Sequence, residues 1–411
     1  MSREVPDGWR TVDLGDVAKE SRSRNSELSI SEERLVGVFK DQGMVPMRER
    51  VRGTSVERCK VVRPGDFAYN PMRINIGSIA RSTADANLMV SPDYVVFSPD
   101  TNKIDGLFLD CLRKSEAWAA FVGNAGDGGV RIRIYFEHLA RFRFNLPPLH
   151  EQSRIAEILS SIDEAIVAMR AVIEQTGKIK QSVLERLLTK GIGHARFKQT
   201  EIGEIPEGWE VGEVQEHFHV QLGKMLSKAA KVGSSPSPYL RNANVQWGRI
   251  DTEDLLHMDF SEQEKQKFRL QRGDLLVCEG GDVGRCAIWN DGQEMYYQKA
   301  LHRLREKTGV VRNQFLMYVL VRIFTSKALS AGLVGTNSIA HFTREQFLRL
   351  KFPVPDADEQ NAICETLEAL DASTRENISK QEALLTLKSA LTSDLLTGRK
   401  RVTNALPMAA E

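Results

Sequence analysis

Three segments combine asparagine with arginine, glutamine or histidine, and the chemistry of these side chains is recognition rather than catalysis. They are residues 69–75 (YNPMRIN), 241–247 (RNANVQW) and 335–341 (GTNSIAH). Arginine contacts phosphates, and arginine, asparagine and glutamine pair with the edges of bases through two hydrogen bonds. Arg131 and Arg133 follow a glycine-rich loop at the equivalent place in the first half of the chain. The alternative is an ordinary solvated turn in each place, because asparagine and glycine favour turns.

Basic residues gather near these segments although the net charge of the chain is only +1. Between Arg48 and Arg81, eight basic residues stand against three acidic ones. Residues 221–249 contain five basic residues and no acidic one, and residues 298–305 form a third basic cluster. Six acidic residues follow at 251–264, so charge is segregated along the chain. The near-neutral total argues against a uniformly basic nucleic-acid binder and leaves local basic patches open.

From these segments and clusters we predict which side chains contact DNA. In the first half of the chain they are Arg48, Arg50, Arg52, Lys60, Tyr69, Asn70, Arg73, Asn75, Arg131 and Arg133. In the second half they are Lys224, Lys228, Arg241, Asn242, Asn244, Arg249, Arg285, Lys299, His302, Arg303, Asn337 and His341.

Signatures of covalent chemistry are missing from the sequence. There is no GxxxxGK[ST] phosphate loop, no GxSxG nucleophile turn and no HExxH metal motif. Residues 69–72 are close to the Asn-Pro-Pro-aromatic motif that holds adenine in amino-methyltransferases, but the second proline and the aromatic residue are absent, and a strand-to-turn junction is favoured. Asp274 and Glu279 have no lysine at the spacing of a nuclease metal site. We therefore predict no catalytic residue, no metal site and no cofactor bound by this chain.

Composition places the chain among ordinary globular proteins. Its 411 residues are 41% hydrophobic and 27% charged, which predicts two or more domains and excludes disordered and fibrous classes. No apolar run approaches 18 residues, and the start of the sequence has no signal-peptide pattern. The five scattered cysteines form no CxxC pair, as is typical of reduced thiols. We expect a cytoplasmic protein with no membrane association.

The second half of the chain repeats the first. Pro6-Asp7-Gly8-Trp9 returns as Pro206-Glu207-Gly208-Trp209, 200 positions later. Further matches recur at an offset of 208, and they pair Glu151-Gln152 with Glu359-Gln360, Asp163 with Asp371, and Leu187-Leu188-Thr189 with Leu395-Leu396-Thr397. This indicates a tandem duplication with a net insertion of 8 residues early in the second copy.

Each copy consists of two parts with different sequence patterns. Residues 1 to 148 contain glycine, proline and short β-branched or aromatic runs, which predict strands at 94–97 and 131–134 and a helix over 107–122. After Pro147-Pro148, apolar residues alternate by four and three, which predicts a helical rod of roughly 60 Å. The positions of this stripe are Ile155, Leu159, Ile162, Ile166, Met169, Ile173, Val183 and Leu187.

The second copy contains an equivalent rod with a more polar stripe. Its positions are Ile363, Leu367, Leu370, Thr374, Asn377, Gln381, Leu387, Leu391 and Leu395. A lone helix of this length would expose its apolar stripe, so we expect the rods to pack against each other in antiparallel orientation. The alternative is a pair of simple core helices in a helical bundle.

The predicted fold is therefore mixed α+β, with two globular α/β domains joined by two long antiparallel helices and related by a pseudo-two-fold. The predicted boundaries are 1–150 for the first domain, 151–192 for the first helix, 193–357 for the second domain, 358–398 for the second helix and 399–411 for a tail.

Several of these motifs together resemble the specificity subunit of type I restriction–modification systems. The resemblance rests on residues 6–9 with 14–17 (LGDV), on residues 69–80, and above all on the junction 146–159 (LPPLHEQSRIAEIL). The second copy supplies residues 353–360 (PVPDADEQ), which depart from the usual Leu-Pro-Pro-Leu. The resemblance covers essentially the whole chain.

The resemblance implies a non-catalytic reader of double-stranded DNA. In this family each globular domain is a target-recognition domain for one half of a bipartite sequence, and the helices set the spacing and carry two modification subunits. S-adenosylmethionine would bind to those subunits, and ATP and Mg²⁺ to the restriction subunits that join them. The alternatives are a coiled-coil scaffold for protein partners and, less favoured, a catalytic methyltransferase or nuclease fragment.

Overall fold

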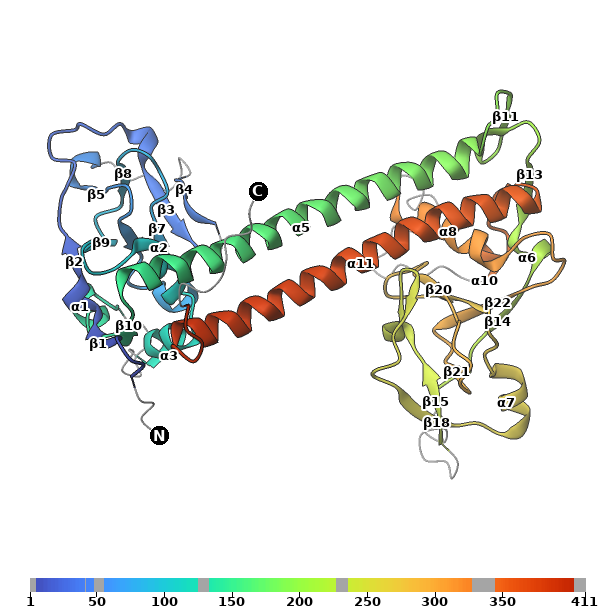
Figure 1. Ribbon diagram of the computed structural model, residues 1–411. Coiled ribbons are helices and arrows are strands. Elements are labelled where there is room, and N and C mark those ends of the chain that lie inside the picture. Colours follow the sequence, from blue (N-terminus) through green and yellow to red (C-terminus); the bar gives the residue numbers. More distant parts are fainter. Residues whose placement is uncertain are drawn as a thin grey trace. The chain divides into compact units, whose positions relative to one another are not determined.

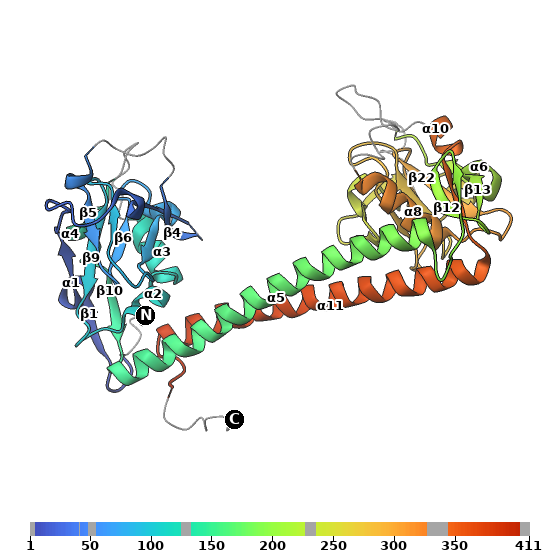
Figure 2. The same cartoon turned by 90° about the horizontal axis from the view of Figure 1, so that it is seen from above.

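The computed structural model describes residues 5–40, 42–47, 55–124, 133–226, 236–326 and 344–402. Contacts divide the chain into two compact units, residues 1–171 with 379–411 and residues 172–378. The division falls within both long helices, α5 (Leu149–Lys190) and α11 (Ala357–Leu396), so each unit contains one domain and part of both helices. Figures 1 and 2 show the elements of each unit.

The first domain contains short strands and helices. Their bounds are β1 Arg10–Asp13, α1 Leu14–Val17, β2 Ala18–Ser21, η1 Glu32–Arg34, β3 Val36–Phe39, β4 Gly43–Pro46, η3 Val56–Arg58, β5 Lys60–Val62, β6 Phe67–Tyr69, η4 Ile74–Ile76, β7 Ile79–Arg81, β8 Leu88–Val90, β9 Val95–Pro99, α2 Gly106–Leu112, α3 Glu116–Asn124, α4 Phe136–Leu139 and β10 Arg143–Leu146.

The second domain contains an equivalent set with additional strands. Their bounds are β11 Phe197–Thr200, β12 Gly203–Pro206, β13 Glu210–Glu213, α6 Val214–His217, β14 Phe218–Leu222, β15 Pro236–Leu240, η6 Asn242–Asn244, β16 Val245–Gln246, β17 Arg249–Ile250, β18 Leu256–Asp259, α7 Glu262–Phe268, β19 Leu275–Cys278, β20 Cys286–Ile288, β21 Tyr296–Tyr297, β22 Leu301–Glu306, α8 Asn313–Thr325, α10 Arg344–Leu348 and β23 Lys351–Val354.

The sheets show the duplication directly. The first domain contains a four-stranded antiparallel sheet in the order β2-β9-β6-β7, and the second contains one in the order β14-β22-β19-β20. The ribbon β1-β10 likewise matches β13-β23, with Arg10 opposite Leu146 and Glu210 opposite Val354. Equivalent strands are offset by 200 before Leu222 and by 208 from Leu275 onward. The predicted insertion therefore lies between β14 and β19.

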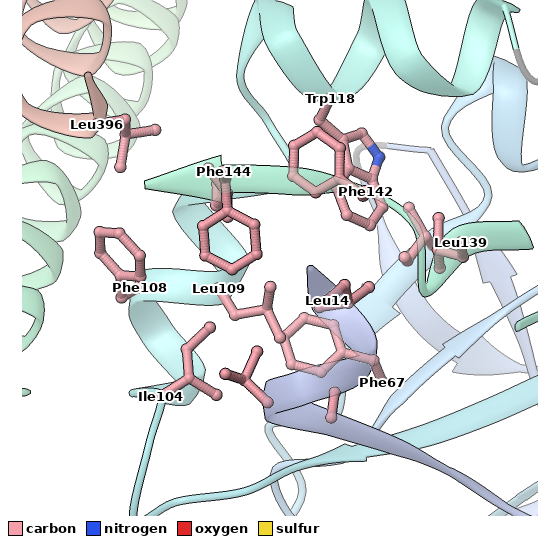
Figure 3. Packing of buried hydrophobic residues seen from close by; sticks show 14 of the residues in the cluster. Leu14, Phe67, Ile104, Phe108, Leu109, Trp118, Leu139, Phe142, Phe144 and Leu396 are labelled. Atoms are coloured by element: carbon pink, nitrogen blue, oxygen red, sulfur yellow. The ribbon is translucent and has the colours of Figure 1, made fainter. Parts of the chain in front are cut away.

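Both long helices are built into the core of each unit. In the first unit, Ile155 and Leu159 of α5 and Leu395 and Leu396 of α11 join one buried cluster. Figure 3 shows Leu396 entering this cluster from α11, on the side of Phe108 and Phe144. Burial of these leucines removes apolar surface from water, at roughly 25 cal/mol per Å². The helices are therefore part of the domain cores, in addition to joining them.

Equivalent ion pairs fix the orientation of the two helices. Asp163 of α5 binds Lys388 of α11 at 2.5 Å in the first unit. In the second unit, Asp371 of α11 binds Lys180 of α5 and accepts a 3.1 Å hydrogen bond from Tyr318. The start of one helix thus lies beside the end of the other within each unit, which confirms the predicted antiparallel pairing (Figures 1 and 2).

Tryptophan and glutamate tie each domain to the ends of both helices. The Trp9 indole donates to Glu151 at 3.0 Å, and Arg401, just after α11, binds the same carboxylate at 2.8 and 2.9 Å. We call Trp9, Glu151 and Arg401 the first junction. Although burial opposes the charged form, hydrogen bonds from Arg401 and Trp9 lower the pKa of Glu151.

The second junction has the same design with a histidine in place of arginine. Trp209 donates to Glu359 at 2.7 Å, and His194, just after α5, lies 2.9 Å from the same carboxylate. Gly191 and Gly398 begin the turns that bring His194 and Arg401 back, with φ of +64° and +70°. A left-handed residue after a helix end is the common glycine C-cap. The tryptophan and glutamate of the repeated motifs thus have a structural role.

Three sequence-based expectations for local structure are corrected. The helix expected over 107–122 is two helices, α2 and α3, separated at Arg113–Ser115. In the strand expected at 131–134, Arg133 and Ile134 are irregular, and the other two residues lie outside the described ranges. Leu387, assigned to the apolar stripe, is 47% exposed, and Leu384 and Lys388 occupy the half-buried positions. Those positions keep the alternation of four and three that Leu387 breaks.

Candidate nucleic-acid interface

The loop after β6 presents apolar and polar side chains to solvent. Asn70 accepts a hydrogen bond from the backbone of Met72 at 3.0 Å, and Gly77 ends η4 in the left-handed region with φ of +91°. This turn confirms the strand-to-turn junction predicted at residues 69–72. Between these two residues, Met72, Arg73, Asn75 and Ile76 are exposed.

Two other segments meet this loop. The backbone N–H of Ile134 donates to the Pro71 carbonyl at 3.0 Å, which brings Arg133 and Tyr135 alongside. The Ser78 hydroxyl donates to Val38 at 2.7 Å, and Lys40 packs over Gly77. We call the resulting exposed set the first loop surface, and it consists of Phe39, Lys40, Met72, Arg73, Asn75, Ile76, Arg133 and Tyr135.

The first loop surface contains three of the residues predicted to contact DNA, namely Arg73, Asn75 and Arg133. Its cations are suited to phosphate contacts, and its apolar side chains are suited to thymine methyl groups or base steps. Phe39, Lys40, Met72, Ile76 and Tyr135 were not among the predicted residues. The available sequence signal for Met72 was its position next to Arg73, within the segment 69–75 that had already been selected.

Other predicted residues of the first domain do not join this surface. Tyr69 is fully buried in the sheet, where burial raises its pKa, so the prediction that it contacts DNA is wrong. Asn70 is half-buried, and its side-chain oxygen already accepts the hydrogen bond of the turn. Lys60 is half-buried in β5, which pairs with β8, and burial lowers its pKa. Arg48, Arg50, Arg52 and Arg131 lie outside the described residues.

In the second domain, the β19–β20 loop meets η6. The Asn242 amide donates to the Gly280 carbonyl at 2.8 Å, and Arg285 donates to the Asn242 carbonyl at 2.7 Å and to Asp282 at 2.9 Å. Trp247 follows and is 39% exposed. We call Asn242, Gln246, Trp247, Gly280, Gly281 and Arg285 the second loop surface. The backbone of this surface bends at Gly280 and Gly281.

Two second-loop-surface atoms lack partners within the described residues. The side-chain oxygen of Asn242 and the Nε of Arg285 are buried and make no hydrogen bond there. A buried polar atom without a partner costs about 1–3 kcal/mol. These two groups are therefore suited to pairing with a ligand.

Several predicted residues of the second domain form hydrogen bonds or ion pairs with other residues of that domain. Asn244 is buried and donates to the Asp251 and Asp254 carbonyls at 2.9 and 3.0 Å, so the prediction that it contacts DNA is wrong. Arg241 pairs with Asp254. Lys224 binds Glu264 at 2.6 Å, and this contact lowers the pKa of Glu264.

His302 and Arg303 are core residues of β22. They are 0% and 7% exposed, and burial together with the nearby Arg344 charge lowers the pKa of His302 to about 4. Arg303 donates to the Lys267 carbonyl at 3.0 Å and lies over the Tyr297 ring. The prediction that these two residues contact DNA is wrong, because β22 lies in the middle of a sheet and both side chains, which point to opposite faces of it, are buried.

The remaining predicted residues are exposed or undescribed. Arg249 and Lys299 are exposed, and Arg249 lies 3.6 Å from Asp251. Lys228, Asn337 and His341 lie outside the described residues.

The described residues contain no group of three metal-binding side chains. Asp274, considered above as half of a metal pair, is instead buried and held by Arg305 at 2.6 and 2.9 Å. Across the described ranges, each helix is too short or too polar for a membrane span.

The combination of a duplicated sheet with a pair of long helices is also found in known proteins. The model of the type I restriction modification DNA specificity domain matches residues 6–175 and 206–387. This chain therefore belongs to the family of type I restriction–modification specificity subunits, which are non-catalytic and determine the DNA target of their complexes.

One individual relative spans nearly the whole chain and another spans part of it. The MjaVIII specificity subunit of Methanocaldococcus jannaschii is 28% identical over 97% of this chain and 95% of its own length. The Escherichia coli EcoKI specificity subunit is 28% identical over 39% of this chain and 36% of its own length.

Solved structures share the fold at low identity. The S subunit from M. genitalium has a TM-score of 0.58 at 13% identity, covering 98% of this chain and 99% of its own. A chain from a study of complex assembly and conformational transition of the type I system has a TM-score of 0.60 at 17% identity, covering 97% and 100%.

Proposed function

We propose that each loop surface reads one half of a bipartite double-stranded DNA target, and that α5 and α11 set the spacing between the halves. The observation that carries the proposal is the contrast between the two copies. Their sheets have the same strand order, but Met72, Arg73 and Ile76 occupy the β6–β7 loop where Gly280 and Gly281 occupy its equivalent. A shared scaffold with different loops is what two different half-sites require.

The complex in which this chain acts supplies the chemistry. Two modification subunits would methylate DNA with S-adenosylmethionine, and restriction subunits would add cleavage that depends on ATP and Mg²⁺. This chain would bind none of these cofactors itself and would act in the cytoplasm. Family membership supports assembly with such subunits.

The test measures binding of the modification complex to its own target, identified by methylome sequencing. The double variant Arg73→Ala, Arg133→Ala should weaken binding by about 30-fold or more, since each lost contact costs about 1–3 kcal/mol and 1.4 kcal/mol is a factor of ten. The slope of log K against log salt should also become less steep by about 1 for each lost phosphate contact.

The matched control is Arg170→Ala, an exposed arginine on α5 in the same unit. It should leave the affinity unchanged. Equal losses in the control and the double variant, or none in either, would contradict the proposal. A coiled-coil scaffold for protein partners would bind target and unrelated DNA equally weakly.

A further inference from the structure

Four large apolar side chains are exposed on the first loop surface. Phe39, Met72, Ile76 and Tyr135 are 48%, 46%, 61% and 43% exposed. A single exposed apolar side chain is ordinary on a protein surface, whereas several on contacting segments mark an interaction site. The partner of this surface should therefore present apolar groups of its own.

The loop that contains Met72 and Ile76 is anchored by buried neighbours. Pro71 and Ile74 are buried, and Ile74 belongs to the main core cluster of the first unit. The backbone N–H of Ile76 donates to the Arg73 carbonyl at 3.2 Å. These contacts keep the two exposed side chains out of the core before any ligand binds, and such preorganisation lowers the cost of binding.

Polar side chains lie among the apolar ones. Arg73 and Asn75 are exposed in the same loop, between the two apolar positions. The Arg133 guanidinium donates to the Tyr135 hydroxyl at 3.4 Å. Arginines are suited to the phosphates along a DNA groove, and asparagine is suited to the edge of adenine. The apolar side chains between them would then face base edges inside the groove.

The apolar group that DNA presents on its base edges is the 5-methyl group of thymine, which lies in the major groove. An A·T pair presents this methyl group together with the N6 and N7 atoms of adenine, which an asparagine can bind. Apolar side chains can also enter DNA as a wedge between base steps, from the minor groove of about 6 Å width. The first loop surface collects side chains from three segments, which fits the major groove of about 12 Å better.

The second copy has no apolar side chain at the equivalent loop positions. At an offset of 208, Met72 corresponds to Gly280 and Ile76 to Gly284. Of the six residues that define the second loop surface, Trp247 is the one with a large apolar side chain. Apolar contacts should therefore matter more in the half-site of the first domain than in the half-site of the second.

We propose that Met72 and Ile76, with Phe39 and Tyr135 beside them, bind the methyl groups of thymines in the half-site read by the first domain. This inference rests on the proposed function, because that function places the first loop surface on DNA. It goes further by naming the chemical group that is recognised and by assigning it to one half-site. That half-site then contains A·T pairs that face the first loop surface.

The experiment first removes the methyl groups from the DNA. In the target of the modification complex, identified by methylome sequencing, the thymines of one half-site at a time are replaced by uracil, which pairs with adenine in the same way and lacks the methyl group. Each contacted methyl group that is lost should weaken binding of the wild-type complex by about fourfold. This loss should occur in the half-site of the first domain and be small or absent in the other.

The second arm removes the apolar side chains from the protein. The double variant Met72→Ala, Ile76→Ala should bind the natural target more weakly than wild type does. Uracil in the half-site of the first domain should then cost this variant less than twofold, because its contacts with the methyl groups are already lost. Its slope of log K against log salt should equal that of wild type, since an apolar contact releases no counterions.

The matched control is Leu107→Ala, which truncates a 44% exposed leucine of α2 in the same domain. It should bind both DNAs as wild type does, and circular dichroism should show that both variants fold. The proposal is overturned if uracil has no effect in either half-site, or if it costs the double variant and wild type the same factor in each. If the wild-type complex binds its target no better than unrelated DNA, the proposed function fails as well, whereas specific binding that ignores uracil defeats the thymine contact alone.

Discussion

Two adjacent residues of β22 show how burial decides what a side chain can do. His302 and Arg303 are in a basic run that is typical of a nucleic-acid contact, yet both lie in the core. A histidine with its pKa lowered to about 4 is neutral at pH 7 and brings no charge to phosphate. Arg73 and Arg133 were predicted from residue type in the same way, and both are exposed members of the first loop surface.

The Glu151 carboxylate yields a prediction at this scale. Glu151→Gln removes the charge that Arg401 and Trp9 bind, and should lower the free energy of unfolding by about 2 kcal/mol at pH 7. Because the folded pKa of Glu151 lies below its ordinary value of 4.5, its contribution is present at neutral pH and is lost as pH falls through the folded pKa. Urea unfolding at several pH values measures this.

The control for this prediction is Glu157→Gln, whose side chain is 62% exposed on the same helix. The control should change stability little at any pH. A difference between wild type and Glu151→Gln that persists unchanged at low pH would contradict the assignment.

At the scale of elements, the two long helices have charged residues at equivalent positions, and these residues pair the helices with each other. Asp163 and Asp371 occupy equivalent positions in the two copies, as do Lys180 and Lys388. Each aspartate binds the lysine of the other helix, so a single duplicated pattern specifies both halves of the antiparallel pair. The same two positions therefore set the register of the helix pair in both units.

Charge reversal tests this register. Lys388→Asp places two carboxylates together in the first unit and should cost about 1 kcal/mol of stability, a modest value because both side chains are about one-third exposed. Adding Asp163→Lys should restore most of the loss. A double-mutant cycle from urea unfolding gives the coupling energy.

The exposed pair Lys178–Glu174, within α5 alone, serves as the comparison. Reversing its charges should give a smaller coupling energy, near a few tenths of a kcal/mol. Additive losses at Asp163 and Lys388 would show that their ion pair does not set the register.

For the whole molecule, the two long helices belong to both compact units, so their length should act on both domains at once. Inserting one heptad into α5 after Ala171 and one into α11 after Ile378 keeps the apolar stripe continuous. Each insertion adds about 10 Å, or about three base pairs of DNA. Methylome sequencing should find the same half-sites with a spacer longer by about that amount. New half-sites with the old spacing would contradict the proposed role of the helices.

The sequence alone determined the features that repeat or have a strong period. The duplication, the antiparallel helix pair and the family follow from motifs at fixed offsets and from apolar residues that alternate by four and three. Such patterns extend over tens of residues, so a wrong interpretation of one residue does not change the prediction. The site residues had no such support, because each depends on the direction of one side chain.

Tertiary structure decided which polar residues remain free to bind. Tyr69, Asn244 and His302 are in segments with the composition of a binding surface, and strand pairing or internal hydrogen bonds turn them inward. The first loop surface brings together segments far apart in the chain, such as the segment at Lys40 and the loop that ends at Gly77. No local pattern contains such contacts, because they exist only once the sheets and helices have packed.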